Sequence, residues 1–361
     1  MSAFAAIRMG FDVAILEKEK GSPAGELAAY EFTGSPREKK LLKKFAAVSD
    51  VITLENEFID YRLLEYIESL GKKVIPSSVT VSLIQDKLIQ KQTLAKHKIP
   101  LTKFTEVNHK KDFESTAAEL GLPFVLKSRK MGYDGYGNAL VRNKKDFIAA
   151  FQRLTHRHSK LLAEEFVDFK MELAVMVART KKEIVVYPVV ETIQKNHICH
   201  TVIAPAKLNT TLLNKARKIA LESVKAVKGF GLYGIEMFCT SSGKLLVNEM
   251  APRPHNSGHY TIEGCITSQF ENHVRAAFGL PLGSCEMVKP SAVMINLLGK
   301  TNTAGIVKNY NRALGDPNVH LHVYGKKQSR VGRKMGHVTV TGNDRKKILK
   351  EAKQAERKII I

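Results

Sequence analysis

The sequence places two glutamates, Glu236 and Glu249, where a single hairpin would bring them together. Two strand-like runs flank Ser242 and Gly243, which predicts a two-residue turn between antiparallel strands. In that register Glu236 lies directly opposite Glu249, and facing carboxylates repel each other. A divalent cation would remove this repulsion, and hard oxygen ligands select Mg²⁺ or Mn²⁺. Asn248 adds a neutral oxygen; the alternative is a solvated acidic pair on an exposed face.

Polar and cationic residues follow this hairpin directly. Arg253, His255 and Asn256 stand in a proline-containing loop, where donors beside a metal site would hold an anion or stabilise developing negative charge. A purely structural polar loop is the alternative interpretation. Nearer the C-terminus, Lys326 and Arg333 belong to a glycine-containing basic cluster, which indicates either an anion site or a solvated turn.

A lysine followed by a glycine-rich loop suits a phosphate group. Lys127 ends an apolar strand and is followed by Gly132, Gly135 and Gly137, so loop amides can approach phosphate oxygens while the ammonium supplies charge. The pattern is not a Walker A motif, because GxxxxGK[ST] is absent. The strand at 162–167 could pair with an adenine edge, but taken alone it is better explained as an ordinary strand with surface acids.

Composition limits the classes to which these residues can belong. The chain has 361 residues, 44% hydrophobic and 25% charged, which excludes disordered and fibrous proteins and allows two or three domains. No apolar run approaches the roughly 20 residues that span a bilayer. Charged residues come too early for a secretory signal, so we expect a cytoplasmic protein. The four scattered cysteines form no CxxC pair, which indicates reduced thiols rather than zinc or disulfides.

The net charge of +22 raises the question of nucleic acid. The lysines are spread along the chain and are rarely interleaved with aromatic residues. We therefore expect solvated helix faces or a generally basic proteome, with attraction of anionic small substrates as the next interpretation. Nucleic acid is an unlikely partner on this evidence, and a membrane is not expected.

Alternating helices and strands position these residues. The N-terminal part alternates them, which predicts a parallel, doubly wound α/β sheet. A boundary follows at Pro76, and residues 82–96 are predicted as one helix. Strands are predicted at 124–128, 161–166, 172–178, 184–190, 234–238 and 244–249, with the pair 172–178 and 184–190 forming a hairpin. The C-terminal part is strand-rich. The expected domains are 1–78, 79–290 and 291–361.

Four motifs together give a family resemblance that covers residues 1 to about 341. They are VITLENE, VLKSRKMGYDGYGN, LLVNEMAPRPHNSGHY and YGK…GRKMGHVTV. The chain resembles the ATP-grasp superfamily and, within it, the N5-carboxyaminoimidazole ribonucleotide synthetases. The resemblance implies a Rossmann-like first domain, a two-lobed ATP-grasp centre, a small C-terminal domain and a homodimer. The family's opening strand and glycine loop would precede Met1, so the first domain is expected to be shortened.

The resemblance also assigns roles to residues. For ATP it implies Lys87 and Lys127 at the phosphates, Glu164, Glu165, Phe166 and Val167 at the adenine, Glu172 at the ribose, and Asn248 beside them. Glu236 and Glu249 match its magnesium ligands. For aminoimidazole ribonucleotide it implies Glu55 or Glu57, Tyr133 and Asp134, with Lys326 and Arg333 at the phosphate. Arg253, His255, Asn256 and Asp134 would act at the reacting groups.

The implied reaction is carboxylation of 5-aminoimidazole ribonucleotide in purine biosynthesis, driven by ATP and bicarbonate through carboxyphosphate. Mg²⁺ and cationic side chains would offset the charge on the phosphoryl oxygens, and the loop 132–137 would close over the site. Two alternatives remain open. One is a related ATP-grasp ligase such as a formate-dependent glycinamide ribonucleotide transformylase; the other is an inactive, basic nucleic-acid-binding or scaffold protein.

Overall fold

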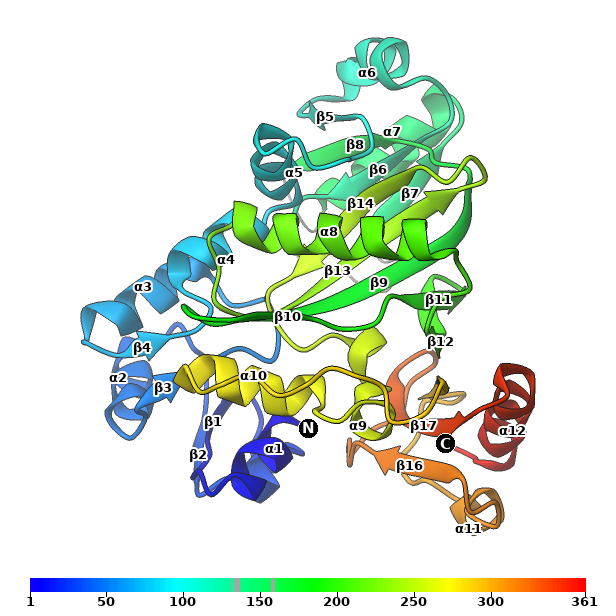
Figure 1. Ribbon diagram of the computed structural model, residues 1–361. Helices are drawn as coiled ribbons and strands as arrows, with labels where there is room; N and C mark the ends of the chain where they lie inside the picture. Colours follow the sequence, from blue (N-terminus) through cyan, green and yellow to red (C-terminus); the bar gives the residue numbers. More distant parts are fainter. Residues whose placement is uncertain (131, 133–136, 157–159) are drawn as a thin grey trace.

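The structure is a computed structural model that describes residues 1–130, 132, 137–156 and 160–361 (Figure 1). Its N-terminal part alternates short helices and strands: α1 (Ser2–Arg8), β1 (Ala14–Glu17), the 3-10 turn η1 (Gly25–Leu27), β2 (Tyr30–Thr33), α2 (Lys39–Ala47), β3 (Val51–Ile52), α3 (Tyr61–Ser69) and β4 (Lys73–Val74). Strand β1 pairs with β2 in parallel, and β3 pairs with β4 in parallel. Parallel pairing was expected, but in the described residues these strands form two separate two-stranded sheets rather than one.

The predicted helix at 82–96 is wrong, because two helices occupy this segment. Helix α4 (Ser78–Ile84) ends before Asp86, and α5 (Lys87–Lys96) begins after it. The Asp86 carboxylate accepts hydrogen bonds from the amides of Leu88 and Ile89, at 3.0 and 3.5 Å, and so caps α5. It also forms an ion pair with Arg129, 2.8 Å away, which fixes the break against the residue that follows β6 (Phe124–Ser128).

A small antiparallel sheet forms one lobe of the central region, in the order β5-β8-β6-β7. Its strands are β5 (Phe104–Val107), β6 (Phe124–Ser128), β7 (Asn138–Val141) and β8 (Leu161–Glu165); the turn η2 (Lys110–Asp112) and the helices α6 (Phe113–Leu120) and α7 (Lys144–Thr155) accompany them. The rings of Phe113, Phe124 and Phe147 meet in its core, with centroids 5.5 to 6.4 Å apart. This packing holds strand β6, which carries Lys127.

A nine-stranded sheet forms the rest of the centre and continues into the C-terminal part. Its strands are β9 (Phe169–Arg179), β10 (Ile184–Val186), β11 (Val190–Lys195), β12 (Ile198–Ala204), β13 (Gly231–Thr240), β14 (Leu245–Ala251), β15 (Ser291–Leu298), β16 (Val319–Val323) and β17 (Lys334–Gly342). The predicted hairpin of β9 and β10 is confirmed. Because β12 pairs with β15, the sheet crosses the expected boundary at residue 290 without interruption.

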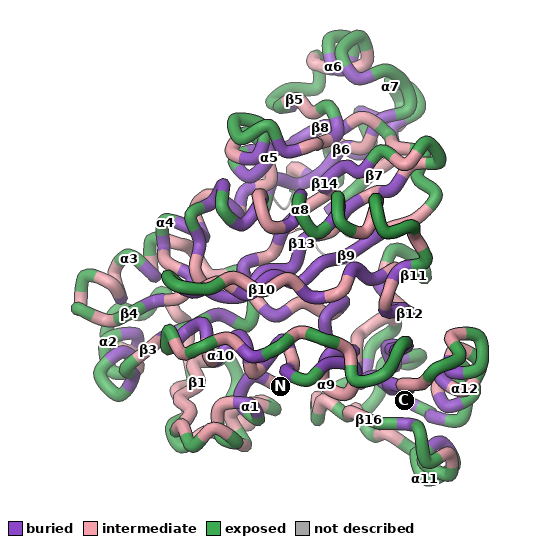
Figure 2. The backbone as a smooth tube through the Cα atoms, viewed as in Figure 1, coloured by how far each residue is buried: buried purple, intermediate pink, exposed green. Residues whose placement is uncertain are grey.

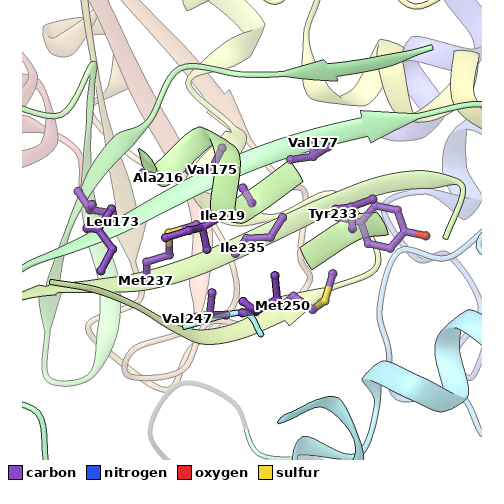
Figure 3. Packing of buried hydrophobic residues seen from close by; sticks show 14 of the residues in the cluster. Leu173, Val175, Val177, Ala216, Ile219, Tyr233, Ile235, Met237, Val247 and Met250 are labelled. Carbon is purple, nitrogen blue, oxygen red and sulfur yellow. The ribbon is translucent and has the colours of Figure 1, made fainter. Parts of the chain in front are cut away.

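Helices cover this sheet and bury its inner face. Helix α8 (Thr210–Ala226) lies along β9 and β13 and packs Ala216 and Ile219 against Ile235 and Met237 (Figure 3). The remaining helical segments are η3 (Asn256–Gly258), α9 (Thr261–Gly264), α10 (Gln269–Phe278), α11 (Tyr310–Ala313) and α12 (Arg345–Lys358). Burial is concentrated in the central strands, and the outer helix faces are exposed (Figure 2). Among the described residues, no helix is long and apolar enough to cross a membrane.

Candidate functional site

The hairpin of β13 and β14 brings Glu236 directly opposite Glu249, as the sequence predicts. The predicted two-residue turn is nevertheless wrong. Thr240 and Lys244 close a three-residue loop through an amide-to-carbonyl bond of 3.0 Å, with Gly243 in the left-handed region at φ +77°. A bulge between Glu236 and Met237 then shifts the register by one residue, at Asn248. The loop and the bulge displace the register in opposite senses, so the two acids still meet.

The two carboxylates have different electrostatic surroundings. Burial is the largest influence on both and raises the pKa of each, although neither side chain is fully enclosed. The Lys87 ammonium forms an ion pair with Glu249 and brings the pKa of that carboxyl below its usual value. The pKa of Glu236 stays raised, because burial is reinforced by the charges of Glu249 and Glu172. Glu236 is therefore the carboxylate on which an added cation would act most strongly.

Helix α5 holds Lys87 in place through a side-chain bridge to strand β14. The Gln90 amide donates to the carbonyl of Met250 and accepts from its amide, both at 3.0 Å, in the manner of a strand partner. Gln90 is fully buried, so this bridge is shielded from water. It sets the first turn of α5 beside Glu249, the residue before Met250.

Lys127 reaches the same place from the small sheet. Its ammonium lies 3.1 Å from the Asn248 side-chain oxygen and 3.1 Å from a Glu164 oxygen. Glu164 is also 3.0 Å from the Lys91 ammonium and accepts a 3.0 Å bond from Thr102. Burial would raise the pKa of Glu164, but Lys127 and Lys91 more than offset it and hold the pKa at about 2. Burial lowers the pKa of Lys91 to about 8.

The Glu164 side chain is 2% exposed and lies between two lysines, where it orients Lys127. Its strand β8 pairs with β5 and with β6 at this residue. The expected contact of Glu164 with an adenine stays a prediction. The sequence analysis missed Lys91 and Thr102; the signal was that Lys91 follows Lys87 by one helical turn and shares its face.

The other residues expected at ATP lie at the end of β8, directly after it, and on β9 of the large sheet. Glu165 accepts a 2.9 Å hydrogen bond from the amide of Lys103, Phe166 is exposed, and Val167 is half-buried. Glu172 lies on β9 within electrostatic range of Glu236, and burial raises its pKa. Its Oε2 is buried and has no hydrogen-bond partner among the described residues. These placements are compatible with the expected roles but do not test them.

The loop after the hairpin joins the acidic pair to the N-terminal part. Arg253 forms an ion pair with Glu57 through two guanidinium nitrogens, whereas Glu55 acts on Arg253 only through its charge. His255 places Nε2 3.5 Å from Glu236. Burial, reinforced by the charges of Arg253 and Lys334, lowers the pKa of His255 to about 4, so its ring is neutral at pH 7. Of the two candidate acids, Glu57 is therefore the one that the structure brings to this loop.

The C-terminal basic cluster comes within range of the acidic pair through Lys334. Lys326 donates a 2.7 Å hydrogen bond to the carbonyl of Lys334, and Arg333 donates one of 2.7 Å to the carbonyl of Gln328. The Lys334 charge lowers the pKa values of Glu236 and His255, which shows that it lies within electrostatic range of the acidic pair. Lys334 belongs to the basic cluster that the sequence shows, but the family resemblance assigned roles only to Lys326 and Arg333. Tyr133, Asp134 and most of the loop 132–137 lie outside the described residues.

Within the described ranges, no three or more His, Cys, Asp or Glu side chains form a group that could hold a metal ion. Glu236 and Glu249, with Asn248 beside them, thus form an incomplete ligand set. Such a set suits Mg²⁺, which takes one or two carboxylates and completes its shell with water and substrate phosphates. The raised pKa of Glu236 agrees with this, since the residue lacks a cationic neighbour as close as the one beside Glu249.

Comparison with known proteins gives three consecutive family matches. Residues 1–85 match the ribonucleotide synthetase preATP-grasp domain, residues 92–270 the ATP-grasp domain, and residues 292–351 the phosphoribosylaminoimidazole carboxylase C-terminal domain. The N5-carboxyaminoimidazole ribonucleotide synthase of Bacillus subtilis is 37% identical over 94% of this chain and 87% of its own length. The phosphoribosylaminoimidazole carboxylase of Ogataea methanolica is 44% identical over 93% of this chain and 63% of its own length. The chain thus spans about three fifths of the first curated relatives it matches.

Solved structures agree with the sequence relatives. Carboxyaminoimidazole ribonucleotide synthase from Aspergillus clavatus, complexed with ATP, has a TM-score of 0.91 at 37% identity and covers 98% of this chain and 94% of its own. The Thermotoga maritima N5-carboxyaminoimidazole ribonucleotide synthetase has a TM-score of 0.88 at 42% identity and covers 99% and 95%. A further Aspergillus clavatus structure holds ADP and 5-aminoimidazole ribonucleotide, with a TM-score of 0.90 at 36% identity and coverage of 98% and 94%.

Proposed function

Since the chain belongs to the N5-carboxyaminoimidazole ribonucleotide synthase family of ATP-grasp proteins, we propose that it uses ATP and bicarbonate to carboxylate 5-aminoimidazole ribonucleotide in purine biosynthesis. The observation that carries the proposal is that Glu236 faces Glu249 across the hairpin, and that lysines from both lobes contact this hairpin. Such a site combines ligands for a metal with cations for a triphosphate. The product is N5-carboxyaminoimidazole ribonucleotide.

Two bond changes make up the proposed reaction. A bicarbonate oxygen attacks the γ-phosphorus of ATP; the new O–P bond forms as the bond to the β-phosphate oxygen breaks, and ADP leaves. The resulting carboxyphosphate, or the carbon dioxide it releases, then receives the exocyclic amine of the ribonucleotide. A C–N bond forms, inorganic phosphate leaves, and the amine loses a proton. Both steps need water excluded, because carboxyphosphate hydrolyses readily.

The residues have distinct tasks in this proposal. Lys87 and Lys127 hold the phosphates, and Glu164 keeps the Lys127 ammonium oriented. Glu236 and Glu249 would hold Mg²⁺, which supplies Lewis-acid stabilisation of the phosphoryl oxygens when bound. Arg253 faces the same region and, held by Glu57, is oriented before substrate binds.

The remaining assignments extend the proposal to the second substrate. Tyr133 and Asp134 would meet the aminoimidazole ring, and Lys326 and Arg333 its ribose phosphate. The family resemblance supports these roles. The electrostatic effect of Lys334 on Glu236 supports the placement of basic side chains of the C-terminal cluster near the site. From the resemblance we also propose a homodimer that acts in the cytoplasm. Light scattering of the purified protein tests the dimer, and microscopy of a tagged chain tests the location.

Measurement of ADP release tests the function. We expect release to depend on both bicarbonate and 5-aminoimidazole ribonucleotide; equal turnover without bicarbonate would contradict the proposal. Turnover that requires formate and glycinamide ribonucleotide would favour the transformylase alternative. Salt-sensitive binding to DNA or RNA without ATP turnover would favour the nucleic-acid-binding alternative.

A variant pair tests the metal assignment. Glu249→Gln removes one charge of the facing pair and is expected to lower ADP release at least about 100-fold and to weaken Mg²⁺ activation. Glu222→Gln removes an acid of an exposed ion pair on α8 and is the matched control. Full activity in Glu249→Gln would refute the assignment of Glu249 as a metal ligand.

A further inference from the structure

Three side chains of the segment 256–263 each bond to a residue in or directly after a C-terminal strand. The amides of Asn256 and Asn296 exchange two hydrogen bonds, one of 3.0 Å and one of 2.5 Å. His259 Nδ1 lies 2.9 Å from the hydroxyl of Tyr324. The third contact is made from α9, where the Glu263 carboxylate bonds to His322 of β16. The loop that carries the proposed catalytic residues is thus tied to a different part of the chain.

The sheet register places the C-terminal partners in one row. His337 on β17 pairs directly with Asn296 on β15 and with His322 on β16. The rings of His322 and His337 stack, with centroids 4.5 Å apart, and His322 lies 2.6 Å from Glu263. Asn296 and His337 are fully buried. Rows of this kind hold their geometry because the backbone hydrogen bonds of three strands fix the spacing.

The Tyr324 hydroxyl joins His337 of this row to His259 of the loop. It lies 2.9 Å from His259 Nδ1 and 2.9 Å from His337 Nδ1, and a hydroxyl that bridges two nitrogens donates to one and accepts from the other. The Asn256 amide nitrogen also points at His259 Nδ1, at 3.4 Å, which makes this atom the acceptor. The hydroxyl therefore donates to His259, and His337 Nδ1–H donates to the hydroxyl.

A second observation agrees with this order of protons. If the proton of His337 is on Nδ1, its Nε2 is unprotonated. This buried atom has no hydrogen-bond partner in the described part of the chain. A bare acceptor without a partner is less costly than a buried N–H without one. Burial also lowers the pKa values of His259 and His337 well below the usual value, so both rings are neutral.

Tyr324 also adjoins the proposed phosphate cluster. It precedes Lys326 by two residues, and the Lys326 ammonium lies 5.4 Å from the centre of the Tyr324 ring. The segment that would bind the ribonucleotide phosphate and the loop that would act on the phosphoryl group therefore share one side chain. Neither the family resemblance nor the sequence motifs assign a role to this contact.

We propose that Tyr324 is a positioning residue whose hydroxyl, held by His337, fixes the loop 253–259 in the arrangement that phosphoryl transfer requires. The proposal rests on the proposed function, because its main readout is ADP release. Tyr324 does not touch the reacting atoms; it acts through His259 and Asn256. Its loss should therefore lower kcat and leave the binding of ATP unchanged.

Tyr324→Phe removes the hydroxyl and keeps the ring. We expect kcat for ADP release to fall about tenfold, the effect of one buried hydrogen bond on a transition state, with KM for ATP within about twofold of wild type. Tyr233→Phe is the matched control, because it removes a buried hydroxyl that donates at 2.9 Å to the carbonyl of Phe230 in the main core. An unchanged kcat in folded Tyr324→Phe would overturn the proposal, as would an equal loss in both variants.

A second pair of variants tests the order of protons and remains informative if Tyr324→Phe does not fold. In His337→Asn an amide N–H can stand where Nδ1–H stood, so we expect kcat within about threefold of wild type. In His337→Leu no donor remains, and kcat should fall at least about tenfold. Equal activity in the two variants would overturn the assignment of His337 as the donor.

Imidazole ¹⁵N shifts of the full chain separate failure of this proposal from failure of the proposed function. The expected signature is an Nδ1–H tautomer for His337 and an Nε2–H tautomer for His259, and Tyr324→Phe should shift the His259 ring nitrogens. This readout needs no catalysis. Inactive wild-type protein that shows these tautomers would contradict the proposed function alone, and an Nε2–H tautomer at His337 would contradict the positioning role.

Discussion

Replacement of Glu164 by glutamine tests the buried charge network beneath Lys127. The substitution preserves shape and removes one negative charge between two lysines whose side chains are 2% and 10% exposed. The difference between a folded pKa of about 2 and the ordinary 4.5 corresponds to about 3 kcal/mol of stability at pH 7. Removing one partner of a buried ion pair typically costs about 3–5 kcal/mol. Both lines of reasoning predict a loss of about 3 kcal/mol.

The sign of the pH dependence follows from the lowered pKa of Glu164. Its contribution to the free energy of unfolding is complete above pH 4.5 and is lost as the pH falls through 4.5 toward 2. Glu164→Gln should therefore lose stability at pH 7 and lack this part of the acid sensitivity. The wild type and the variant should converge in stability near pH 2.

Amide hydrogen exchange is the suitable assay, because it reports the stability of the small sheet separately from that of the rest of the chain. A loss of 3 kcal/mol makes the exchange of amides in β6 and β8 about 100-fold faster. Glu114→Gln is the control: it removes an exposed ion pair with Lys144 in the same lobe, with Glu114 71% exposed, and should cost at most about 1 kcal/mol. Equal exchange rates in the two variants would refute the reasoning.

Three further predictions follow from single contacts. Glu57→Gln leaves the Arg253 guanidinium buried without its counter-charge and should lower kcat/KM for ADP release at least about tenfold, measured in steady state. Burial lowers the pKa of His273 to about 4, so this residue's contribution to stability is complete above pH 6.5 and is lost as the pH falls from 6.5 to 4. In His273→Gln the free energy of unfolding, measured by thermal unfolding at several pH values, should fall by up to about 3 kcal/mol less than in the wild type across that interval. Gly243→Ala should cost about 1 kcal/mol in urea unfolding and leave ADP release unchanged, because φ is +77° and the added Cβ meets only Leu212 at ordinary distance.

The facing acids could be predicted because hydrophobic alternation and a turn signal lie within one short segment. The same local signals identified most of the strands in the centre of the chain. Asp86 was harder, because its capping role is fixed by an ion pair with Arg129, which follows strand β6 more than 40 residues along the sequence. The spacing of apolar residues in this segment is that of one continuous helix, so the sequence pattern does not indicate the break between α4 and α5.

Glu164 illustrates a second limit on sequence reasoning. It lies on a strand where alternation gives no sign that a charged position faces inward. Its partners Lys91 and Thr102 are brought to it by the packing of α5 on the small sheet. The long-range pairing of β12 with β15 is equally hidden, since nearly a hundred residues separate the two strands. Only contacts between distant segments reveal such roles.

The two facing carboxylates do not need a cation equally. Repulsion between two equal carboxylates was the original reason to expect a cation, but Lys87 already neutralises Glu249. The remaining negative charge is concentrated on Glu236, whose pKa stays raised despite the charges of Lys87 and Lys334. Its neighbour His255, 3.5 Å away, has a neutral ring at pH 7 and does not offset that charge. If the site holds Mg²⁺ as proposed, Glu236 would therefore gain more from the ion than Glu249, and Lys87 and the ion would together offset the charge of a bound triphosphate.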